Sequence, residues 1–486
     1  MSAGGSARPR LIVHGHFYQP QRADPWTMAV PAEPAAAPFH DWNARIDAEC
    51  YRPNVERGNL ARMSFDLGPT LATWLTREDG PTYEGWIASD SPGERAMAQP
   101  YHHTILPLAS LADRRTEIRW GLRDFELRFG RPATGMWLPE TAVDLPTLRL
   151  LADEGIAYTI LAPWQAADPD LDTRRPYRVA LGEGRSLVVV FYDAGLSGAV
   201  SFDPAATADA DAFAERDVAA RLADAAFADG TPPLTVIATD GELYGHHLKF
   251  RDLFLQRLIA PHPSTAVTRS FDVVGFATAL DEPPGRRFPL TRIVERTSWS
   301  CHHGVARWTA ECPDVPDGRW KGPLRSALDR LAGGIDAVSV ELLRRQDLGG
   351  VGGVANRGAD GLLAEARDAY GEVVAGPVPV DPFMARWSPG ASVSQRRVLA
   401  DVLEAQRWRL AMYASDGWFW DDPARGETAQ VLRAAARAVR IIDELASTRL
   451  ERRLVEDLSL LVSPSRAVDG ARLYREALEA VGQPAP

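Results

Sequence analysis

The stretch Gly-Met-Trp-Leu-Pro-Glu at residues 135–140 is a short apolar run that ends in a carboxylate, Glu140. A second run, Leu-Thr-Val-Ile-Ala-Thr-Asp at residues 234–240, ends in Asp240 and leads into Gly-Glu-Leu-Tyr-Gly-His. Continuous apolar runs are typical of strands that are buried on both faces, as in parallel sheets. Because α/β barrels place catalytic side chains at the carboxyl ends of their strands, we expect both carboxylates at one barrel mouth.

The same pattern recurs outward from these two runs. Residues 11–13, 156–161 and 187–191 are further apolar runs, each followed by a polar or turn-forming segment. Residues 145–155 carry leucines at helical spacing and end in Gly155, which predicts a helix with a glycine at its C-terminal cap. Strands that alternate with helices indicate a βα barrel or a doubly wound sheet.

The alternation fades after about residue 311. Helix-forming segments follow at 325–345, 398–412, 427–444 and 471–480. A chain of 486 residues is too long for one small core. We therefore predict an α/β catalytic barrel domain at residues 1–310 and a helical C-terminal domain at 311–486 that contributes to the active-site rim.

Composition limits the kinds of partner. Hydrophobic residues make up 45% and charged residues 24% of the chain, which is ordinary for a globular protein. A net charge of −11 argues against a nucleic-acid partner, since phosphates require a basic surface. No run approaches the ~20 apolar residues of a membrane helix, and the first run is too short for a signal peptide. We expect a cytoplasmic protein without a membrane partner.

Three cysteines, Cys50, Cys301 and Cys312, are too few for a disulfide scaffold and predict reduced thiols. Cys301 and Cys312 lack close-spaced cysteine partners, which argues against a zinc site built from them. The cysteines thus predict no metal site, and we expect no cofactor; whether the histidines described below bind a metal stays open.

Two carboxylates of this kind suit the cleavage of a glycosidic bond. One carboxyl group protonates the leaving oxygen, and the other attacks the anomeric carbon or activates water. The alternative is that Glu140 only caps the following helix and Asp240 only begins a turn. The aromatic and histidine residues beside both carboxylates favour the catalytic interpretation.

Histidines form further candidate contacts. His14 and His16 are two residues apart, so both would project from one face of a strand. They would bind sugar hydroxyls or a metal ion, or be satisfied histidines of the core. Of the adjacent pair His102 and His103, only one can face the site from an extended strand, and we favour His103. The pair at 302–303 either forms a turn at the site's edge or contacts it.

An aromatic segment, Ser-Asp-Gly-Trp-Phe-Trp-Asp-Asp, occupies residues 415–422. Sugar rings present apolar C–H faces, so carbohydrate sites combine flat aromatic side chains with carboxylates that bind hydroxyls. An alternative that the sequence supports equally well is that these aromatics anchor the helical domain onto the barrel. The count of 14 tryptophans favours sugar binding only slightly.

Together these segments resemble glycoside hydrolase family 57, the α-amylase and 4-α-glucanotransferase type. In chain order, the similar segments are residues 14–20 (first motif), 101–108 (second region), 135–140 (nucleophile motif), 240–246 (acid/base motif) and 415–422 (final aromatic segment). The resemblance implies a (β/α)7 barrel followed by a helical domain, and a retaining mechanism on α-glucans.

The resemblance also implies roles for single residues. Glu140 would be the nucleophile and Asp240 the general acid/base. The residues that would line the substrate subsites are His14, His16, His103, Glu242, His246 and Asp416, with Trp137 stacked near the scissile sugar and Trp418 further out. Asp240 must be protonated to act as an acid, and we expect burial and the nearby Glu140 to raise its pKa.

Some positions depart from the family pattern. They are Phe17 and Tyr18 inside the first motif, His247 where branching-type relatives often have Trp, and an extra Gly417 in the last segment. Both carboxylates match, so the implied chemistry is unaffected. The linkage, the substrate's chain length and the choice between hydrolysis and transfer stay open.

Two other functions fit the same residues. A metal-dependent polysaccharide deacetylase or α-mannosidase-like barrel would use Asp and His ligands at such a mouth, and His14, His16 and His103 could supply them. A non-catalytic glucan-binding protein would keep the barrel without turnover. The presence of both carboxylates argues against the latter.

Overall fold

The computed structural model describes residues 8–90, 95–223, 226–260, 270–281, 287–348, 358–376, 378–484 and 486. The chain divides into two compact units, which are described separately. The first comprises Met1–Gln19, Ala32–Gln99 and Arg128–Trp299, and the second comprises Pro20–Pro31, Pro100–Leu127 and Ser300–Pro486. Among the described residues, no helix combines the length and apolarity that crossing a bilayer requires.

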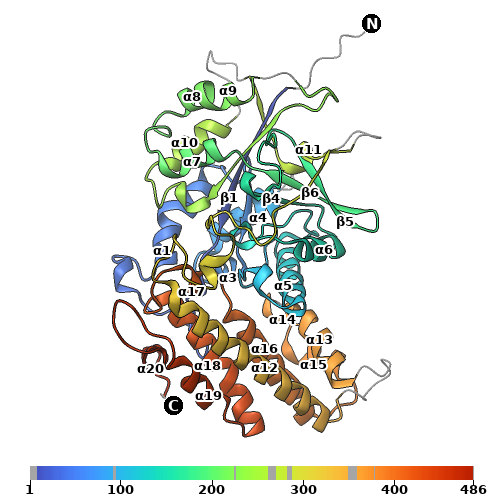
Figure 1. The fold of residues 1–486 in the computed structure, drawn as a ribbon, viewed down its shortest axis with the longest axis vertical. Coiled ribbons are helices and arrows are strands. Elements are labelled where there is room, and N and C mark those ends of the chain that lie inside the picture. Colours follow the sequence, from blue (N-terminus) through green and yellow to red (C-terminus); the bar gives the residue numbers. More distant parts are fainter. Residues whose placement is uncertain are drawn as a thin grey trace. The chain divides into compact units, whose positions relative to one another are not determined.

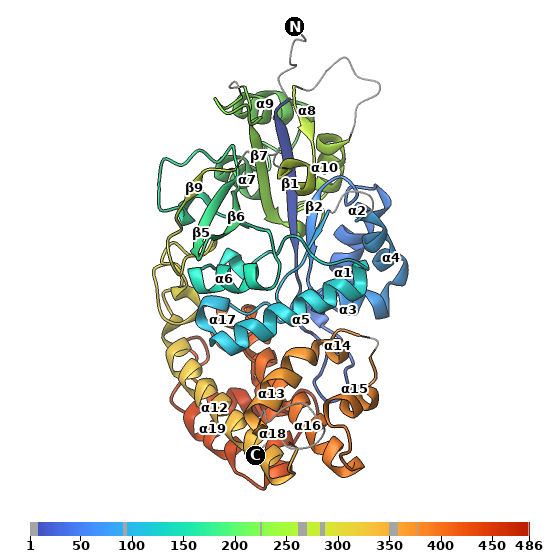
Figure 2. The ribbon, with the colours of Figure 1, turned by 90° about the vertical axis from the view of Figure 1, so that its right-hand side faces the viewer.

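Parallel strands form the centre of the first unit. Strand β1 (Arg10–Phe17) pairs in parallel with β2 (Ser64–Leu67) on one side and β7 (Leu234–Asp240) on the other (Figure 2). Strand β2 then pairs with β3 (Ala96–Met97). In the register of β1 and β7, His16 lies opposite Asp240, so both residues reach the same end of the sheet.

A second group of strands continues the same direction. Strand β4 (Tyr158–Leu161) pairs in parallel with β6 (Arg185–Phe191). Single parallel bridges join Ala98 to Met136 and Gly135 to Tyr158, which links β3 to β4 through residues 135–136. Just beyond β6, the Asp193 N–H donates to the Val236 carbonyl of β7 at 2.8 Å.

The parallel segments therefore follow the order β7, β1, β2, β3, residues 135–136, β4 and β6, with the last beside the first. This is the arrangement of the predicted (β/α)7 barrel, and the fold class is confirmed. Strand β5 (Tyr177–Gly182) pairs antiparallel with β6, while the two-residue strands β8 (Asp272–Val273) and β9 (Leu290–Thr291) pair with β1 and β5.

Apolar side chains fill the barrel interior. Ile12, Ile160, Val190 and Val236 belong to one buried cluster, which also contains Trp137. The unit's helices are α1 (Trp42–Ile46), α2 (Arg52–Glu56), α3 (Pro69–Glu78), α4 (Gly80–Ser89), α6 (Leu145–Asp153), α7 (Ala194–Phe202), α8 (Ala210–Phe213), α9 (Ala219–Arg221), α10 (Arg251–Ile259) and α11 (Phe276–Ala279). Helix α6 ends before Gly155, which has φ +86, as the glycine signal predicts.

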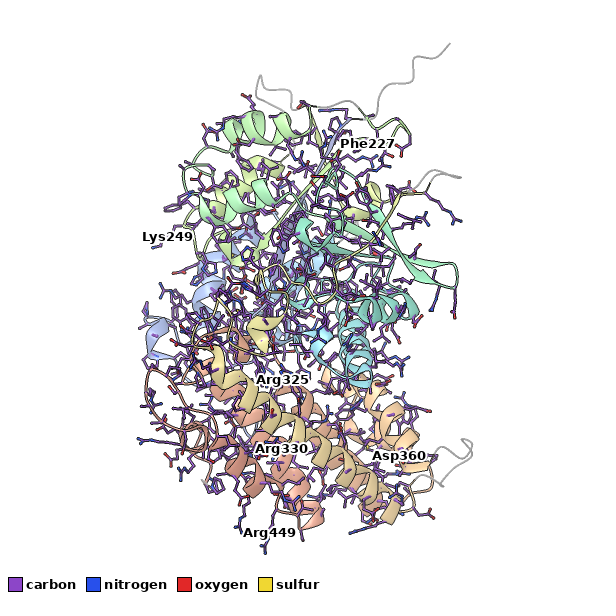
Figure 3. The ribbon with its side chains drawn as sticks, viewed as in Figure 1. Phe227, Lys249, Arg325, Arg330, Asp360 and Arg449 are labelled. Atoms are coloured by element: carbon purple, nitrogen blue, oxygen red, sulfur yellow. The ribbon has the colours of Figure 1, made fainter. Side chains whose placement is uncertain are left out.

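The second unit consists mainly of helices. They are α5 (Leu111–Phe129, up to residue 127), α12 (Lys321–Arg345), α13 (Gly358–Ala369), α14 (Gly371–Val374), α15 (Val380–Trp387), α16 (Val393–Ala411), α17 (Asp416–Phe419), α18 (Gly426–Ala446), α19 (Leu450–Leu458) and α20 (Gly470–Glu479). Helices α12, α16 and α18 pack side by side (Figure 1). Arg330 of α12, labelled in Figure 3, donates to Asp457 of α19 at 2.8 Å.

The division into units differs from the sequence prediction in its details. The chain passes into the second unit after Trp299, close to the predicted boundary at residue 310. The second unit also takes in residues 20–31 and 100–127. The reason is packing: Trp120 of α5 donates its indole N–H to the Arg367 carbonyl of α13 at 2.7 Å.

Candidate active site

Glu140 lies in a strained turn at the end of the 135–136 strand segment. It belongs to the short 3-10 helix Pro139–Thr141 and has φ 57 and ψ 22. A non-glycine residue in this left-handed region costs on the order of 1–3 kcal/mol and is typical of functional sites. Trp299 holds it there: the Trp299 backbone N–H donates to the Glu140 carbonyl and its indole N–H to Glu140 Oε2, both at 3.0 Å.

Trp137 packs beneath the two histidines of β1. Its ring centroid lies 4.9 Å from that of His14 and 5.0 Å from that of His16, with nearly parallel planes, and Trp299 meets it edge-on. Trp137 is 0% exposed, so it offers no face to a sugar ring. The structure thus corrects the expected stacking role: Trp137 is part of the barrel core because it fills the interior below the mouth.

Asp66, at the end of β2, connects the two histidines. Its Oδ1 lies 3.0 Å from His14 Nε2 and its Oδ2 lies 2.8 Å from His16 Nδ1. The Gln99 side-chain amide also donates to Asp66 Oδ2 at 2.8 Å. The second ring nitrogen of His14 contacts Ser64 Oγ at 3.1 Å. Protein groups therefore hold both ring nitrogens of His14.

Burial and pairing set the charges of this group. Burial acts to raise the pKa of Asp66, but His16 and His14 hold that pKa below its usual value. Burial lowers the pKa of His14, which favours a neutral ring. Burial also acts to lower the pKa of His16, but Asp66, Asp240 and Glu242 outweigh it and raise the pKa to about 9. His16 is thus an imidazolium at neutral pH.

Asp240 ends β7, and its side chain is accessible to solvent. Enclosure by protein atoms nevertheless raises the pKa of its carboxyl group, and the negative charge of Asp66 adds to this effect. The positive charges of His16 and His247 act against it. A raised pKa agrees with the requirement that Asp240 carry a proton. Burial and the negative charge of Asp66 both contribute to the rise.

Glu242 is buried in the turn that follows β7. Tyr51 donates its hydroxyl to Glu242 Oε1 at 2.6 Å, and the Gln19 amide donates to the same oxygen at 3.3 Å. Burial raises the pKa of Glu242 to about 7, Asp240 adds to the rise, and the Tyr51 hydrogen bond opposes it. Glu242 is therefore a second carboxyl group that can carry a proton near neutral pH.

His246 lies further along the same turn. Its Nδ1 is 2.6 Å from Glu49 Oε2, and its ring meets that of Trp42 edge-on. The backbone N–H groups of His246 and His247 both donate to the Glu242 carbonyl at 3.0 Å. This compact turn fixes where Glu242 and His246 lie relative to the end of β7.

The remaining predicted residues belong to the second unit. His103 has φ 56, and its Nδ1 lies 2.6 Å from Ser415 Oγ. The Ser415 N–H donates to the His103 carbonyl, so His103 lies beside Asp416, the first residue of α17. His102, in contrast, is buried against Glu117 at 2.8 Å. The preference for His103 over His102 stays a prediction, and the buried contact of His102 with Glu117 is consistent with it.

Trp418 is buried in the helical unit. It is 1% exposed, and the Arg325 guanidinium lies 4.6 Å from its ring centroid. The rings of Trp320 and Tyr413 lie roughly parallel to it at 6.4 Å. This packing leaves no ring face for a sugar, so the structure corrects the expected outer subsite and favours the anchoring alternative.

The predicted residues thus form two groups. Glu140, Asp240, Glu242, His14, His16 and His246 belong to the barrel unit, and His103 and Asp416 belong to the helical unit. Sequence reasoning missed Asp66, Tyr51, Gln99 and Trp299. The available signal for Asp66 was weak, because its strand has four residues and only two of them, Phe65 and Leu67, are apolar.

Two family profiles match the sequence. Residues 96–265 match the family described as Glycosyl hydrolase family 57. Residues 317–481 match a domain of unknown function, DUF3536. A comparison with curated proteins finds no match.

Solved structures share the fold. An exo-type maltose-forming amylase from Pyrococcus sp. ST04 has a TM-score of 0.72 at 15% identity, with 96% of this chain and 88% of that chain covered. A branching enzyme from Thermococcus kodakaraensis has a TM-score of 0.56 at 15% identity, with 97% and 94% covered. A 4-α-glucanotransferase from Thermococcus litoralis has a TM-score of 0.55 at 14% identity, with 90% and 60% covered.

These identities are low, so the structural likenesses establish the fold alone. The family match covers β3, the strained turn at Glu140, β4, β6 and β7 with Asp240. The predicted resemblance and the predicted class of enzyme are thereby confirmed: residues 96–265 match glycoside hydrolase family 57, the family that the sequence motifs resemble.

Proposed function

We propose that this protein is a retaining glycoside hydrolase or glucanotransferase that acts on α-1,4-linked glucans. The observation that carries the proposal is the pair Glu140 and Asp240. Both lie at the carboxyl ends of parallel barrel strands, Glu140 is held by two hydrogen bonds from Trp299, and the pKa of Asp240 is raised. An ionised nucleophile and a protonated acid are what double displacement requires.

In the first step, Glu140 attacks the anomeric carbon. The glycosidic C–O bond breaks while Asp240 gives its proton to the leaving oxygen, and a covalent glycosyl–Glu140 ester forms. The Trp299 indole N–H orients the carboxylate through Oε2. Retention requires carboxyl groups about 5–5.5 Å apart, compared with about 6.5–9.5 Å for inversion.

In the second step, Asp240 acts as a base. It removes a proton from water, or from the hydroxyl of an acceptor sugar, and this oxygen attacks the anomeric carbon. The ester bond to Glu140 breaks and the carboxylate is restored. Water as the acceptor gives hydrolysis, and a sugar hydroxyl gives transfer.

The surrounding residues position the substrate and tune the acid. The imidazolium of His16 lies opposite Asp240 in the strand register and limits how far the pKa of Asp240 rises. Glu242 and His246 would bind sugar hydroxyls from the turn after β7. We assign His103 and Asp416, which lie together in the helical unit, to further subsites.

The substrate class rests on the relatives. Their names describe a maltose-forming amylase, a branching enzyme and a 4-α-glucanotransferase. We infer an α-glucan substrate for this chain by that analogy. We also assign the protein to the cytoplasm, which the three free cysteines support.

The test compares wild type with Glu140→Gln on malto-oligosaccharides, amylose and glycogen. We expect wild-type turnover with a product of retained anomeric configuration, read by NMR in the first minutes. Glu140→Gln should lose at least about 10⁴-fold in kcat while still binding glucan. The matched control is Glu183→Gln, because Glu183 belongs to the same unit and its side chain is 84% exposed.

Other outcomes would contradict the proposal. A product of inverted configuration would exclude the double displacement. Glucan binding without turnover by wild type would point to a binding protein. The metal-dependent alternative would draw its ligands from His14, His16 and His103, and of these His14 already has both ring nitrogens in contact with Ser64 and Asp66.

A further inference from the structure

Two tight turns follow Trp299 in the chain, and both belong to the helical unit. In the first, the Gly304 N–H donates to the Cys301 carbonyl at 3.2 Å, and Gly304 has φ +80. In the second, Cys312 and Val315 exchange backbone hydrogen bonds of 2.8 and 3.3 Å. Each turn begins with a cysteine and carries a second metal-binding side chain two residues later.

These side chains converge. Cys301 and His303 come from the first turn and Cys312 and Asp314 from the second, and one donor atom from each lies within 4.8 Å of all the others. Both cysteines are buried and unoxidised. His303 and Asp314 close the group on its solvent side, with side chains 40% and 23% exposed.

Hydrogen bonds join the two turns around the same point. Asp314 Oδ2 accepts from the His302 backbone N–H at 3.1 Å and lies 3.2 Å from His303 Nδ1. The backbone amides of His303 and Arg307 interact favourably with the Cys301 thiolate. Amide donors to sulfur and hydrogen bonds between ligands are the outer contacts that orient a metal-binding set.

We propose that Cys301, His303, Cys312 and Asp314 bind one Zn²⁺ ion. Two thiolates, an imidazole and a carboxylate are ligands that zinc accepts in tetrahedral geometry. Bond lengths of ~2.0–2.3 Å place tetrahedral donors about 3.3–3.8 Å apart, so small side-chain rotations suffice. Four protein ligands leave no open position, and the site is therefore structural.

The charges around the site are compatible with zinc. The two thiolates, the carboxylate and the ion together leave one net negative charge. Lys321 is 0% exposed and interacts electrostatically with both Cys301 and Cys312. Burial lowers the pKa of Lys321 to about 7, and the two thiolates act to raise it, so they favour an ammonium that offsets part of the residual negative charge.

The zinc would fix the segment that begins two residues after Trp299, the residue that holds Glu140. The catalytic steps do not involve it, so the site is independent of the proposed function. Cysteine spacing alone argued against a zinc site here. The structure instead brings together two turns, each with a cysteine and a second ligand two residues later. Closely spaced cysteine pairs, the usual sequence signal for zinc, are absent from this pattern.

The first measurement is the zinc content of the full chain, purified under reducing conditions and exposed to ZnSO₄, then desalted. We expect about one zinc per chain, and a Tm that falls by at least about 5 °C after chelation and recovers with zinc. Cobalt(II) in place of zinc should give the visible absorption of a tetrahedral thiolate site, with a sulfur-to-cobalt charge-transfer band.

Variants distinguish the ligands from their neighbours. Cys301→Ser and Cys312→Ser should each weaken zinc binding at least 100-fold and roughly halve the charge-transfer band. His303→Ala and Asp314→Asn alter partly exposed side chains, so these proteins should fold yet bind zinc more weakly. The matched controls are His302→Ala, with an 83% exposed side chain, and Cys50→Ser in the barrel unit, and both should retain zinc.

Three results would overturn the site. They are wild-type protein that binds no zinc after reduction and reconstitution, a zinc content that none of the four ligand variants changes, and equal loss in His302→Ala and His303→Ala. A Cys301–Cys312 disulfide that resists reduction and thereby excludes zinc would equally contradict it. Glu140→Gln should keep its zinc, so a failed activity assay and a failed zinc site give different results.

Discussion

The indole N–H of Trp299 donates to Glu140 Oε2, and this contact comes from a residue far along the chain. We predict that Trp299→Phe keeps most of the ring packing against Trp137 but removes the donor to the carboxylate. A less well oriented nucleophile should lower kcat about 10-fold or more, with KM changed less. Steady-state kinetics with a Tm measurement would check this.

The control for that variant is Trp164→Phe. Trp164 donates its indole N–H to the Ser298 carbonyl, next to Trp299 in sequence, whereas Trp299 donates its indole N–H to Glu140. It should leave kcat nearly unchanged. Equal losses in the two variants would show that the segment as a whole matters rather than the donor to Glu140.

His16 should shape the pH profile. The acid step needs protonated Asp240, so activity is present below the raised pKa of Asp240 and is lost as pH rises through it. Below about 9, the pKa of His16, its positive charge holds the pKa of Asp240 down. His16→Asn removes this charge, and the alkaline limb of kcat/KM should move up by roughly one pH unit.

Asparagine is the chosen replacement because its amide can still donate to Asp66. The control is His40→Asn: His40 contacts Asp41 at 3.0 Å and its side chain is 58% exposed. The His40 variant should keep the wild-type profile. An unmoved alkaline limb in His16→Asn would mean that His16 does not tune the acid.

At the scale of elements, the turn after β7 depends on Gly245. This glycine has φ +147, and a Cβ there would lie 2.4 Å from the Glu49 carbonyl oxygen. Gly245→Ala should therefore push the turn away from Glu49, which pairs with His246, and destabilise the protein by about 1–3 kcal/mol. Chemical denaturation would measure the loss.

Gly198 in α7 is the matched control. A Cβ there meets nothing within 4 Å, so Gly198→Ala should be neutral or stabilising by up to about 1 kcal/mol. Glucan affinity gives a second readout, because the displaced turn carries Glu242 and His246. Equal stability in the two variants would contradict the view that the close contact between Gly245 and the Glu49 carbonyl requires a glycine.

The elements with long, regular signals could be predicted from the sequence. The apolar runs at 156–161 and 187–191 became β4 and β6, and the helical pattern at 427–444 became α18. Strands β2 and β3 were missed because they contain four and two residues. Because β2 was not predicted, Asp66 was missed as well, although it contacts both predicted histidines.

Exposure could not be predicted from residue type either. Trp137 and Trp418 carry the motifs' aromatic signal, yet both are buried. A tryptophan that stacks on a sugar and one that fills a core have the same sequence signature, since both follow or precede apolar residues. Only the packing of distant segments, such as Arg325 over Trp418, separates the two.

At the scale of the whole molecule, the helical unit depends on a segment from the first third of the chain. Asp113 of α5 pairs with Arg367 of α13 at 3.1 Å and with Arg409 of α16 at 2.9 Å. All three side chains are nearly buried. Burial acts to raise the pKa of Asp113, but the two guanidinium groups hold it below its usual value.

This network predicts that the helical unit does not fold from the C-terminal sequence alone. A fragment of residues 300–486 lacks Asp113, so the buried Arg367 loses its carboxylate partner at a cost of several kcal/mol, and Arg409 keeps only Asp336, at 2.7 Å. We expect a poorly cooperative thermal transition by circular dichroism and fast hydrogen exchange in α13 and α16. The DUF3536 match at residues 317–481 would then describe a sequence family and not an autonomous domain.

The same network can be tested in the full chain. Asp113→Asn should destabilise the protein by about 3–5 kcal/mol, because it removes one partner of a buried ion pair. The control is Asp360→Asn, since Asp360 lies on α13 with a side chain that is 78% exposed. That variant should change stability by less than about 0.5 kcal/mol. A cooperative, fully helical fragment together with a stable Asp113→Asn protein would show that α5 is dispensable, and the unit would then be defined by α12–α20 alone.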